Sequence, residues 1–286
     1  MQNIAYYNGK VGPIEEMMVP MNDRACYFGD GVYDATMAVN HVPMHFDDHI
    51  DRIYNSARLI DIEIPMPKEE MKQILQGLID QVEGDSLFVY WQVTRGVGMR
   101  NHPYSGAATG PSLWAWVRPN GMRDVYGAYR CITMEDTRFL HCNIKTINLL
   151  PSVLYTQRAE EAGCDETILH RGERVTECAH SNVHILKDGA LRTAPCDNLI
   201  LPGITRAHRI AQCREMGIPV IEEPFTVSEM MAADEVFFTS ASALCCRIRE
   251  IDGRPVGGRA PQLLRRIQAA AWDEALREVA SIREES

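Results

Sequence analysis

Apolar residues near the start of the chain follow the period of two that is typical of strands. They alternate with polar residues on both sides of Asn8-Gly9, and residues 32–39 form a further predicted strand that enters a turn at Asn40-His41. Two-residue turns of the Asn-Gly type join antiparallel strands in hairpins. We therefore expect the chain to begin with β-sheet.

Two amphipathic helices are predicted next. Asp47 is the expected N-cap of the first, in which apolar residues recur every three or four positions at Ile50, Ile53, Tyr54, Ala57 and Ile60. The same period returns after Pro67, over 71–82. Residues 86–94 and 112–117 are rich in aromatic and β-branched side chains and are predicted strands, and Pro119-Asn120-Gly121 ends this pattern.

Strands and helices alternate again in the second half of the chain. Helices are expected over 149–162, 205–216 and from Pro261 onward, and a hairpin over 182–193. Further strands are predicted near Val220, over 235–239, and through Ile248 to a turn at Asp252-Gly253. The order predicts an α/β or α+β fold in two domains, 1–118 and 124–286, joined by a linker over 119–123.

Length, composition and charge agree with this division. The 286 residues are enough for about two domains, and 45% hydrophobic with 24% charged residues is typical of globular chains. The net charge of −10 divides into −6 for residues 1–118 and −4 for the rest. Since nucleic acid and anionic membranes need a concentrated cationic face, neither is an expected partner.

The distribution of apolar residues and cysteines indicates a cytoplasmic protein. No apolar run is longer than the five residues of 87–91, far fewer than the roughly 20 of a membrane-spanning helix. The start of the chain lacks the features of a secretory signal. Nine cysteines without a CxxC pair argue against a disulfide framework or a zinc ribbon, and we expect no metal site.

Lys145 is the first candidate for chemistry. A lone lysine is usually a solvated surface charge, but this one lies in the apolar segment CNIKTINLL, residues 142–150. Burial there would lower the pKa of its amine and allow it to form a Schiff base.

Three other motifs have both a functional and an ordinary structural interpretation. Gly203-Ile204-Thr205 runs from a loop into a helix, where it could hold a phosphate or simply place Thr205 as a cap. Glu177 follows an apolar strand and is either aimed into a cleft or a surface acid. Arg100 and His102 could bind a carboxylate. The segment 28–33 has neither Rossmann nor Walker spacing, so a nucleotide is not indicated.

Taken together, these segments are much more specific than any one of them. Seven occur in order: FGDGVYDA (28–35), HIDRIYNSA (49–57), QVTRG with RNH (92–102), CNIKTINLL (142–150), VTECAHSN (175–182), LPGITR (201–206) and FFTSASA (237–243). In this order they resemble the fold type IV pyridoxal-phosphate enzymes of aminotransferase class IV, and are most similar to those acting on D-amino acids. The resemblance extends from the first strand to Asp252-Gly253.

The resemblance implies a role for each matching residue. Lys145 would bind pyridoxal 5′-phosphate and move a proton, and Glu177 would pair with the pyridine nitrogen. The positions matching the phosphate site are Arg52, Ile204, Thr205, Ser240 and Ala241. Those matching the trap for the substrate carboxylate are Tyr33, Arg100 and His102. In this family the arginine and the histidine come from the neighbouring subunit, which implies a homodimer.

The implied reaction is transamination of a D-amino acid of the D-alanine type with a 2-oxo acid, 2-oxoglutarate or pyruvate, in two half-reactions. Four positions depart from the D-alanine enzymes: Phe139 replaces tryptophan, His180 serine, Ala241 threonine and Asp34 glutamate. These changes leave the preferred donor and acceptor open, since one pocket residue discriminates by only about 1–3 kcal/mol.

Several alternatives fit the sequence less well. Within the same fold they are a branched-chain L-aminotransferase, an (R)-amine transaminase and an aminodeoxychorismate lyase, against which the Tyr33, Arg100 and His102 set favours a D-amino acid enzyme. Outside it they are a non-catalytic cofactor-binding protein and a scaffold protein. The former would not react with D-alanine, and the latter would be colourless.

Overall fold

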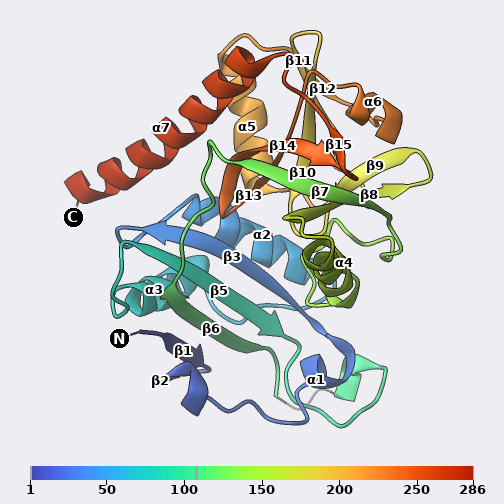
Figure 1. Cartoon of the computed structure of the whole chain (residues 1–286). Coiled ribbons are helices and arrows are strands. Elements are labelled where there is room, and N and C mark those ends of the chain that lie inside the picture. The colour runs from blue at the N-terminus through green and yellow to red at the C-terminus, as the bar shows by residue number, and fades with distance from the viewer. Residues whose placement is uncertain (1, 107–108, 286) are drawn as a thin grey trace. The chain divides into compact units, whose positions relative to one another are not determined.

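The computed structural model describes residues 2–106 and 109–285, and the chain divides into two compact units. The first holds the residues up to Met122, the segment 144–148 and the chain from Glu278 onward, and the second holds 123–143 and 149–277. Both units combine sheet and helix, as predicted (Figure 1).

The placement of residues 144–148 differs from the predicted division, which put Lys145 in the second domain. The segment runs beside the start of a strand of the first unit. The backbone N–H of Tyr33 donates to the Lys145 carbonyl at 2.9 Å, and that of Ile147 donates to the Gly31 carbonyl at 3.1 Å. These backbone hydrogen bonds attach the lysine to the first unit.

The first unit is built on an antiparallel six-stranded sheet in the order β2-β1-β6-β5-β3-β4. The strands are β1 (Ile4–Tyr7), β2 (Lys10–Gly12), β3 (Gly31–Val39), β4 (Val42–Pro43), β5 (Ser86–Thr94) and β6 (Ser112–Pro119). Asn8 and Gly9 have φ of 44° and 93°, and Asn40 and His41 have 50° and 69°. Positive φ at both central residues is required for the type I′ hairpin turn, so both predicted turns are confirmed.

Helices α2 (Phe46–Arg58) and α3 (Lys68–Ile79) pack on this sheet. Ile53 and Leu75 are fully buried there with Trp91. The prediction of Asp47 as N-cap is wrong: the N-cap of α2 is His45, two positions earlier. Asp47 lies instead in the first turn, where a carboxylate still stabilises the helix dipole. The sequence did not indicate the short helices α1 (Arg24–Phe28), η1 (Ile14–Glu16) and η2 (Tyr104–Gly106).

The second unit contains a mixed nine-stranded sheet in the order β12-β11-β10-β13-β14-β7-β8-β9, with β15 beside β14. Its strands are β7 (Ala128–Glu135), β8 (Glu166–Arg171), β9 (Arg174–Cys178), β10 (Asn182–Lys187), β11 (Ala190–Thr193), β12 (Val220–Glu222), β13 (Glu235–Ser240), β14 (Ala243–Ile251) and β15 (Arg254–Pro255). β7 pairs in parallel with both β14 and β8. Neither β7 nor β8 was predicted.

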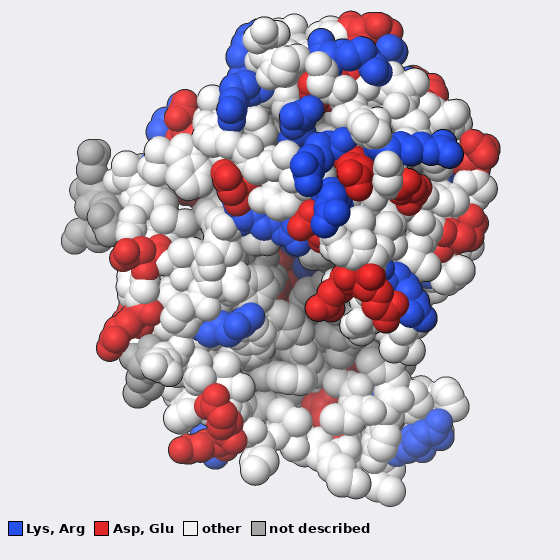
Figure 2. All heavy atoms as spheres, in the orientation of Figure 1, with Lys and Arg blue, Asp and Glu red and all other residues white. Residues whose placement is uncertain are grey.

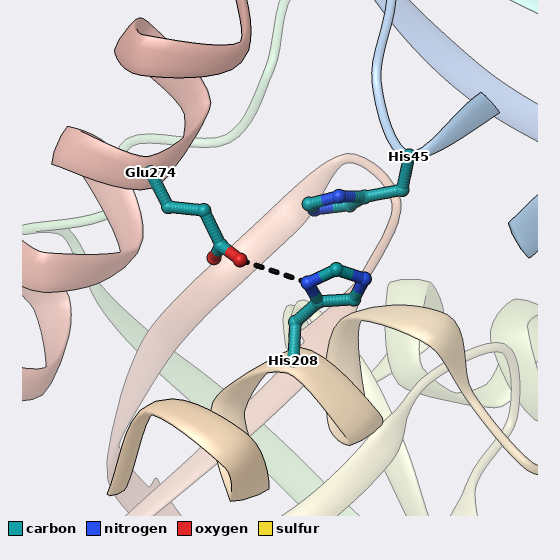
Figure 3. Close-up of side chains that lie close together, drawn as sticks. All are labelled: His45, His208 and Glu274. Atoms are coloured by element: carbon teal, nitrogen blue, oxygen red, sulfur yellow. Dashed lines mark hydrogen bonds and ion pairs between the residues drawn. The ribbon is translucent and has the colours of Figure 1, made fainter. Parts of the chain in front are cut away.

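Four helices belong to this part of the chain: α4 (Leu150–Glu161), α5 (Ile204–Glu215), α6 (Val227–Met231) and α7 (Pro261–Glu285). α5 and α7 are linked by polar contacts. His208 Nδ1 lies 2.8 Å from Glu274 Oε1, as Figure 3 shows, and Arg209 forms an ion pair with the same carboxylate. These contacts fix α5, whose first turn carries two of the predicted site residues.

In the part of the chain that the structure describes, no helix is long and apolar enough to cross a membrane. Charged side chains of both signs are interspersed over the face that Figure 2 shows. The cytoplasmic location stays a prediction.

Candidate active site

Lys145 is held at its backbone on both sides and is half-buried. Its carbonyl accepts the hydrogen bond from Tyr33 on β3, and its N–H donates to Ser56 Oγ on α2 at 3.3 Å. The side-chain Nζ lies 4.2 Å from the centre of the Tyr33 ring. A fixed backbone and one aromatic neighbour place the amine reproducibly, as a nucleophile requires.

Asp34, a buried residue of β3, orients Arg52 through its carboxylate. Arg52 donates from Nε to Asp34 Oδ2 at 2.8 Å and from Nη2 to Oδ1 at 2.7 Å, and His49 Nδ1 lies 2.8 Å from Oδ1. Burial would raise the pKa of Asp34, but Arg52 and His49 hold it well below its usual range. Burial lowers the pKa of His49, against the opposing effect of Asp34. The paired carboxylate therefore fixes the plane of the guanidinium group.

Arg100 and His102 lie on an exposed segment after β5, in the same unit as Lys145. Both contact Phe28, whose ring centre is 5.4 Å from the Arg100 guanidinium carbon and 5.3 Å from the His102 ring. Tyr33 instead stacks on Tyr90, with ring centroids 5.6 Å apart. Arg100 and His102 of the predicted carboxylate trap thus share one aromatic neighbour, whereas Tyr33 contacts another.

In the second unit, Glu177 is a buried carboxylate that accepts three hydrogen bonds. Arg138 Nη1 donates to Oε1 at 2.6 Å, while Asn182 Nδ2 and the Leu201 backbone N–H each donate to Oε2 at 3.0 Å. Burial raises the pKa of Glu177 to about 7, and Arg138 opposes this rise. The surface-acid interpretation is wrong, because Glu177 is only 5% exposed.

Sequence reasoning missed Arg138. It donates from Nε to Asp136 Oδ1 and from Nη2 to Oδ2, both at 2.9 Å, so the guanidinium is clamped between two carboxylates. Asp136 follows β7, whereas Glu177 ends β9, on the far side of β8. No local motif surrounds Arg138, so only the strand order could have revealed it.

The first turn of α5 is shaped by a glycine. A Cβ on Gly203 would lie 1.9 Å from Asn182 Oδ1, the same side chain that donates to Glu177. Gly203 is the N-cap and makes no side-chain cap, so the interpretation of Thr205 as the cap is wrong. Amide groups in a first helical turn have no partner within the helix and bind anions readily.

Ser240 and Ala241 lie at the same end of the sheet as this helix start. Asn182 pairs with Thr239 across β10 and β13, so the next residues, at the end of β13, are close to the strand end that Gly203 contacts. One edge of the second unit therefore carries four phosphate-site candidates together with Glu177. The four are Ile204, Thr205, Ser240 and Ala241.

Two of the positions that depart from the resembled enzymes can be placed in the structure. His180 Nδ1 lies 2.8 Å from Glu166 Oε2, a fully buried carboxylate. Phe139 is 45% exposed and contacts the His141 ring at 5.7 Å.

Comparison with known families identifies this class of site. The model of the amino-transferase class IV family matches residues 31–251, and the chain belongs to this family. Class IV aminotransferases use pyridoxal 5′-phosphate, so the chain is a pyridoxal-phosphate-dependent aminotransferase.

Among its relatives are D-alanine aminotransferases. That of Listeria monocytogenes serotype 1/2a (strain 10403S) is 42% identical over 256 residues, 86% of this chain and 88% of the relative. That of Bacillus licheniformis is 37% identical over 277 residues, 96% and 98% of the two chains. The branched-chain aminotransferase of Thermoproteus uzoniensis, solved with norvaline, has a TM-score of 0.86 at 25% identity, with 94% and 93% coverage. The fold is therefore that of fold type IV aminotransferases.

The described residues fit the cofactor. Lys145 offers a positioned amine, and Glu177 offers a buried carboxylate for a protonated ring nitrogen. The first turn of α5 offers backbone N–H groups with no partner within the helix, and Gly203 leaves room there for the Asn182 side chain. An amine, an acid and a phosphate-binding helix start are the three groups that pyridoxal phosphate needs.

Proposed function

We propose that this enzyme transfers amino groups between D-amino acids of the D-alanine type and a 2-oxo acid, 2-oxoglutarate or pyruvate. The geometric observation that carries the proposal is the amine of Lys145, fixed against Tyr33 at 4.2 Å from the ring centre. D-alanine as the donor is supported by relatives of that name at 37–42% identity, aligned over 86% or more of the chain.

Lys145 would bind the cofactor through Nζ and act as the base for the reaction. When bound, pyridoxal phosphate supplies a ring that withdraws electrons from the substrate Cα. The Lys145 amine, released when the substrate amine replaces it, would accept the Cα proton and deliver it to the cofactor C4′. Glu177 would hold a proton on the ring nitrogen, with its carboxylate oriented by Arg138 at 2.6 Å.

The phosphate would be held by two kinds of donor. Arg52 would contribute charge, since Asp34 already fixes its orientation at 2.7 and 2.8 Å. The others would contribute backbone N–H groups or a hydroxyl from one edge of the second unit: Ile204, Thr205, Ser240 and Ala241.

The substrate carboxylate would be bound by Tyr33, Arg100 and His102, with the arginine and histidine acting across a homodimer. An apolar face of α4 supports a second copy. Leu150, Val153 and Leu154 recur at helical spacing and are 70%, 59% and 54% exposed, although Tyr155 on the same helix is buried. A second copy of the chain would remove this apolar surface from water.

The half-reaction with D-alanine tests the proposed function. D-alanine added to the purified yellow enzyme should convert the visible absorption of the aldehyde form of the cofactor to that of the amine form, and 2-oxoglutarate should reverse the change. L-alanine at the same concentration should leave the spectrum unchanged.

Other outcomes distinguish the alternatives. Conversion by L-leucine but not D-alanine would indicate a branched-chain L-aminotransferase. Conversion by carboxylate-free (R)-amines would indicate an amine transaminase. An unchanged spectrum with every donor would indicate a binding protein.

A further inference from the structure

Arg24, on α1, contacts the segment that carries two residues of the proposed carboxylate trap. It is 4% exposed, and its guanidinium donates from Nη1 to the Asn101 carbonyl at 2.6 Å and from Nη2 to the His102 carbonyl at 3.2 Å. These carbonyls belong to the two peptide planes on either side of His102. Because peptide planes are rigid, fixing both also fixes the backbone angles of His102.

The Arg24 guanidinium is itself held in place. Its Nε donates to Asp30 Oδ2 at 2.7 Å, and Arg95 Nε donates to both oxygens of the same carboxylate at 3.0 Å. The Arg95 guanidinium stacks on Tyr104 at 4.2 Å. The Asp30 carboxylate therefore holds the segment between β5 and η2 at both ends. It binds Arg95 at the start of the segment, and Arg24 links it to the backbone near the end.

Phe28 contacts the side chains of the same segment. Its ring centre lies 4.9 Å from the Arg24 guanidinium carbon, 5.4 Å from that of Arg100 and 5.3 Å from the His102 ring. An aromatic ring in contact with two guanidinium groups restricts the rotamers of both. Arg24 therefore holds the backbone of the segment, and Phe28 holds its side chains.

We propose that Arg24 and Phe28 are positioning residues for substrate binding. They hold Arg100 and His102 in the arrangement that binds the carboxylate of an amino acid or 2-oxo acid. This inference rests on the proposed function. A long side chain that must be ordered on binding weakens the affinity by about threefold to tenfold, so this loss is expected when either contact is removed.

Steady-state kinetics with a double-mutant cycle test the proposal. Arg24→Lys and Phe28→Leu should each raise the KM for D-alanine roughly threefold to tenfold, and leave kcat within about twofold. Phe28→Tyr, which keeps the aromatic face, should retain the parental KM. In an Arg100→Ala background the Phe28→Leu effect on KM should be smaller than in the parent, since only His102 is then left for Phe28 to position.

Hydrogen exchange of the cofactor-loaded enzyme supplies a readout apart from activity. Arg24→Lys should speed amide exchange in residues 97–104 and leave the second unit unchanged. Arg259→Lys is the control, because Arg259 also donates to two successive carbonyls, of Ala232 and Ala233, from Nη2, and to Asp234 from Nε. It should change neither the KM nor exchange in 97–104.

Two results would overturn the inference, and they can be told apart. If Arg100→Ala raises the KM but Arg24→Lys and Phe28→Leu do not, positioning by Arg24 and Phe28 is refuted and the proposed trap stands. If Arg100→Ala itself leaves the KM unchanged, the trap in the proposed function fails, and this inference with it.

Discussion

Glu177 shows how burial and hydrogen bonding oppose each other at a single residue. Burial raises the pKa of its carboxyl group to about 7, whereas Arg138 at 2.6 Å favours the charged form. A bound cationic ring nitrogen would add a second positive partner. Cofactor binding would therefore lower the pKa of Glu177 and favour loss of its proton.

Glu177→Gln should slow proton abstraction while cofactor remains bound. Losing a charge-assisted hydrogen bond costs about 1.5–3 kcal/mol, which corresponds to a rate roughly tenfold to over a hundredfold lower. Stopped-flow measurement of the D-alanine half-reaction checks this. An unchanged rate would show that Glu177 does not act on the ring nitrogen.

The same residue makes the stability of the cofactor-free protein depend on pH. Its folded pKa of about 7 exceeds the ordinary value of 4.5, so the folded state holds the extra proton between these values. The contribution is complete below about pH 4.5 and is lost as pH rises through 7. Wild-type protein should therefore lose more stability than Glu177→Gln between pH 5 and 8, by up to about 1.4 kcal/mol for each pH unit between the two pKa values. Equal losses in thermal unfolding would contradict the raised pKa.

Arg52→Ala should weaken cofactor retention more than turnover at saturating cofactor, because it removes a fixed charge from the proposed phosphate site. Arg58→Ala provides a control on the same helix, since Arg58 is exposed and donates to Asn55, one turn earlier. Fluorescence titration with cofactor compares the two variants. Equal affinity in Arg52→Ala and the parent would make Arg52 a structural residue alone.

At the scale of elements, the sequence predicted the structures whose signals lie within a few residues of one another, such as hairpins. The hairpins at Asn8-Gly9 and Asp188-Gly189 follow from turns that need positive φ, observed at 44° and 93° and at 50° and 77°. β7 was not predicted, because its side chains are mostly half-buried and the strands that pair with it, β8 and β14, are distant in sequence. The pairing of Arg138 with Glu177 depends on that same strand order and was missed for the same reason.

The first turn of α5 gives a prediction at this scale. Gly203→Ala should destabilise the protein and impair cofactor binding, because the new Cβ would lie 1.9 Å from Asn182 Oδ1. Gly77→Ala, within α3 and with no atom within 4 Å of the new Cβ, should instead stabilise by about 0.5–1 kcal/mol. Thermal unfolding and cofactor titration of both variants distinguish steric exclusion from a general effect of removing glycine. A Gly203→Ala protein with parental affinity would argue against this helix start as the phosphate site.

At the scale of the whole molecule, sequence order identified the family where single motifs did not. The segments from 28–35 to 237–243 supply residues to both units, and the family match spans 31–251. What sequence patterns could not give was the attachment of Lys145 to the first unit, since hydrogen bonds to Gly31 and Tyr33 join segments more than a hundred residues apart.

Subunit complementation tests the proposed sharing of Arg100. Lys145→Ala and Arg100→Ala chains should each be nearly inactive on D-alanine. Coexpressed, they should regain up to half the wild-type activity per mixed dimer, because one site then carries both changes and the other neither. No recovery beyond the two parents would place Arg100 in the site of its own chain.

The central claim, that Lys145 binds the cofactor, is tested most directly by borohydride reduction of the purified enzyme followed by peptide mapping. We predict a phosphopyridoxyl label on the peptide that contains Lys145, and none in Lys145→Arg. A label on Lys68, Lys72 or Lys187 instead would contradict the claim.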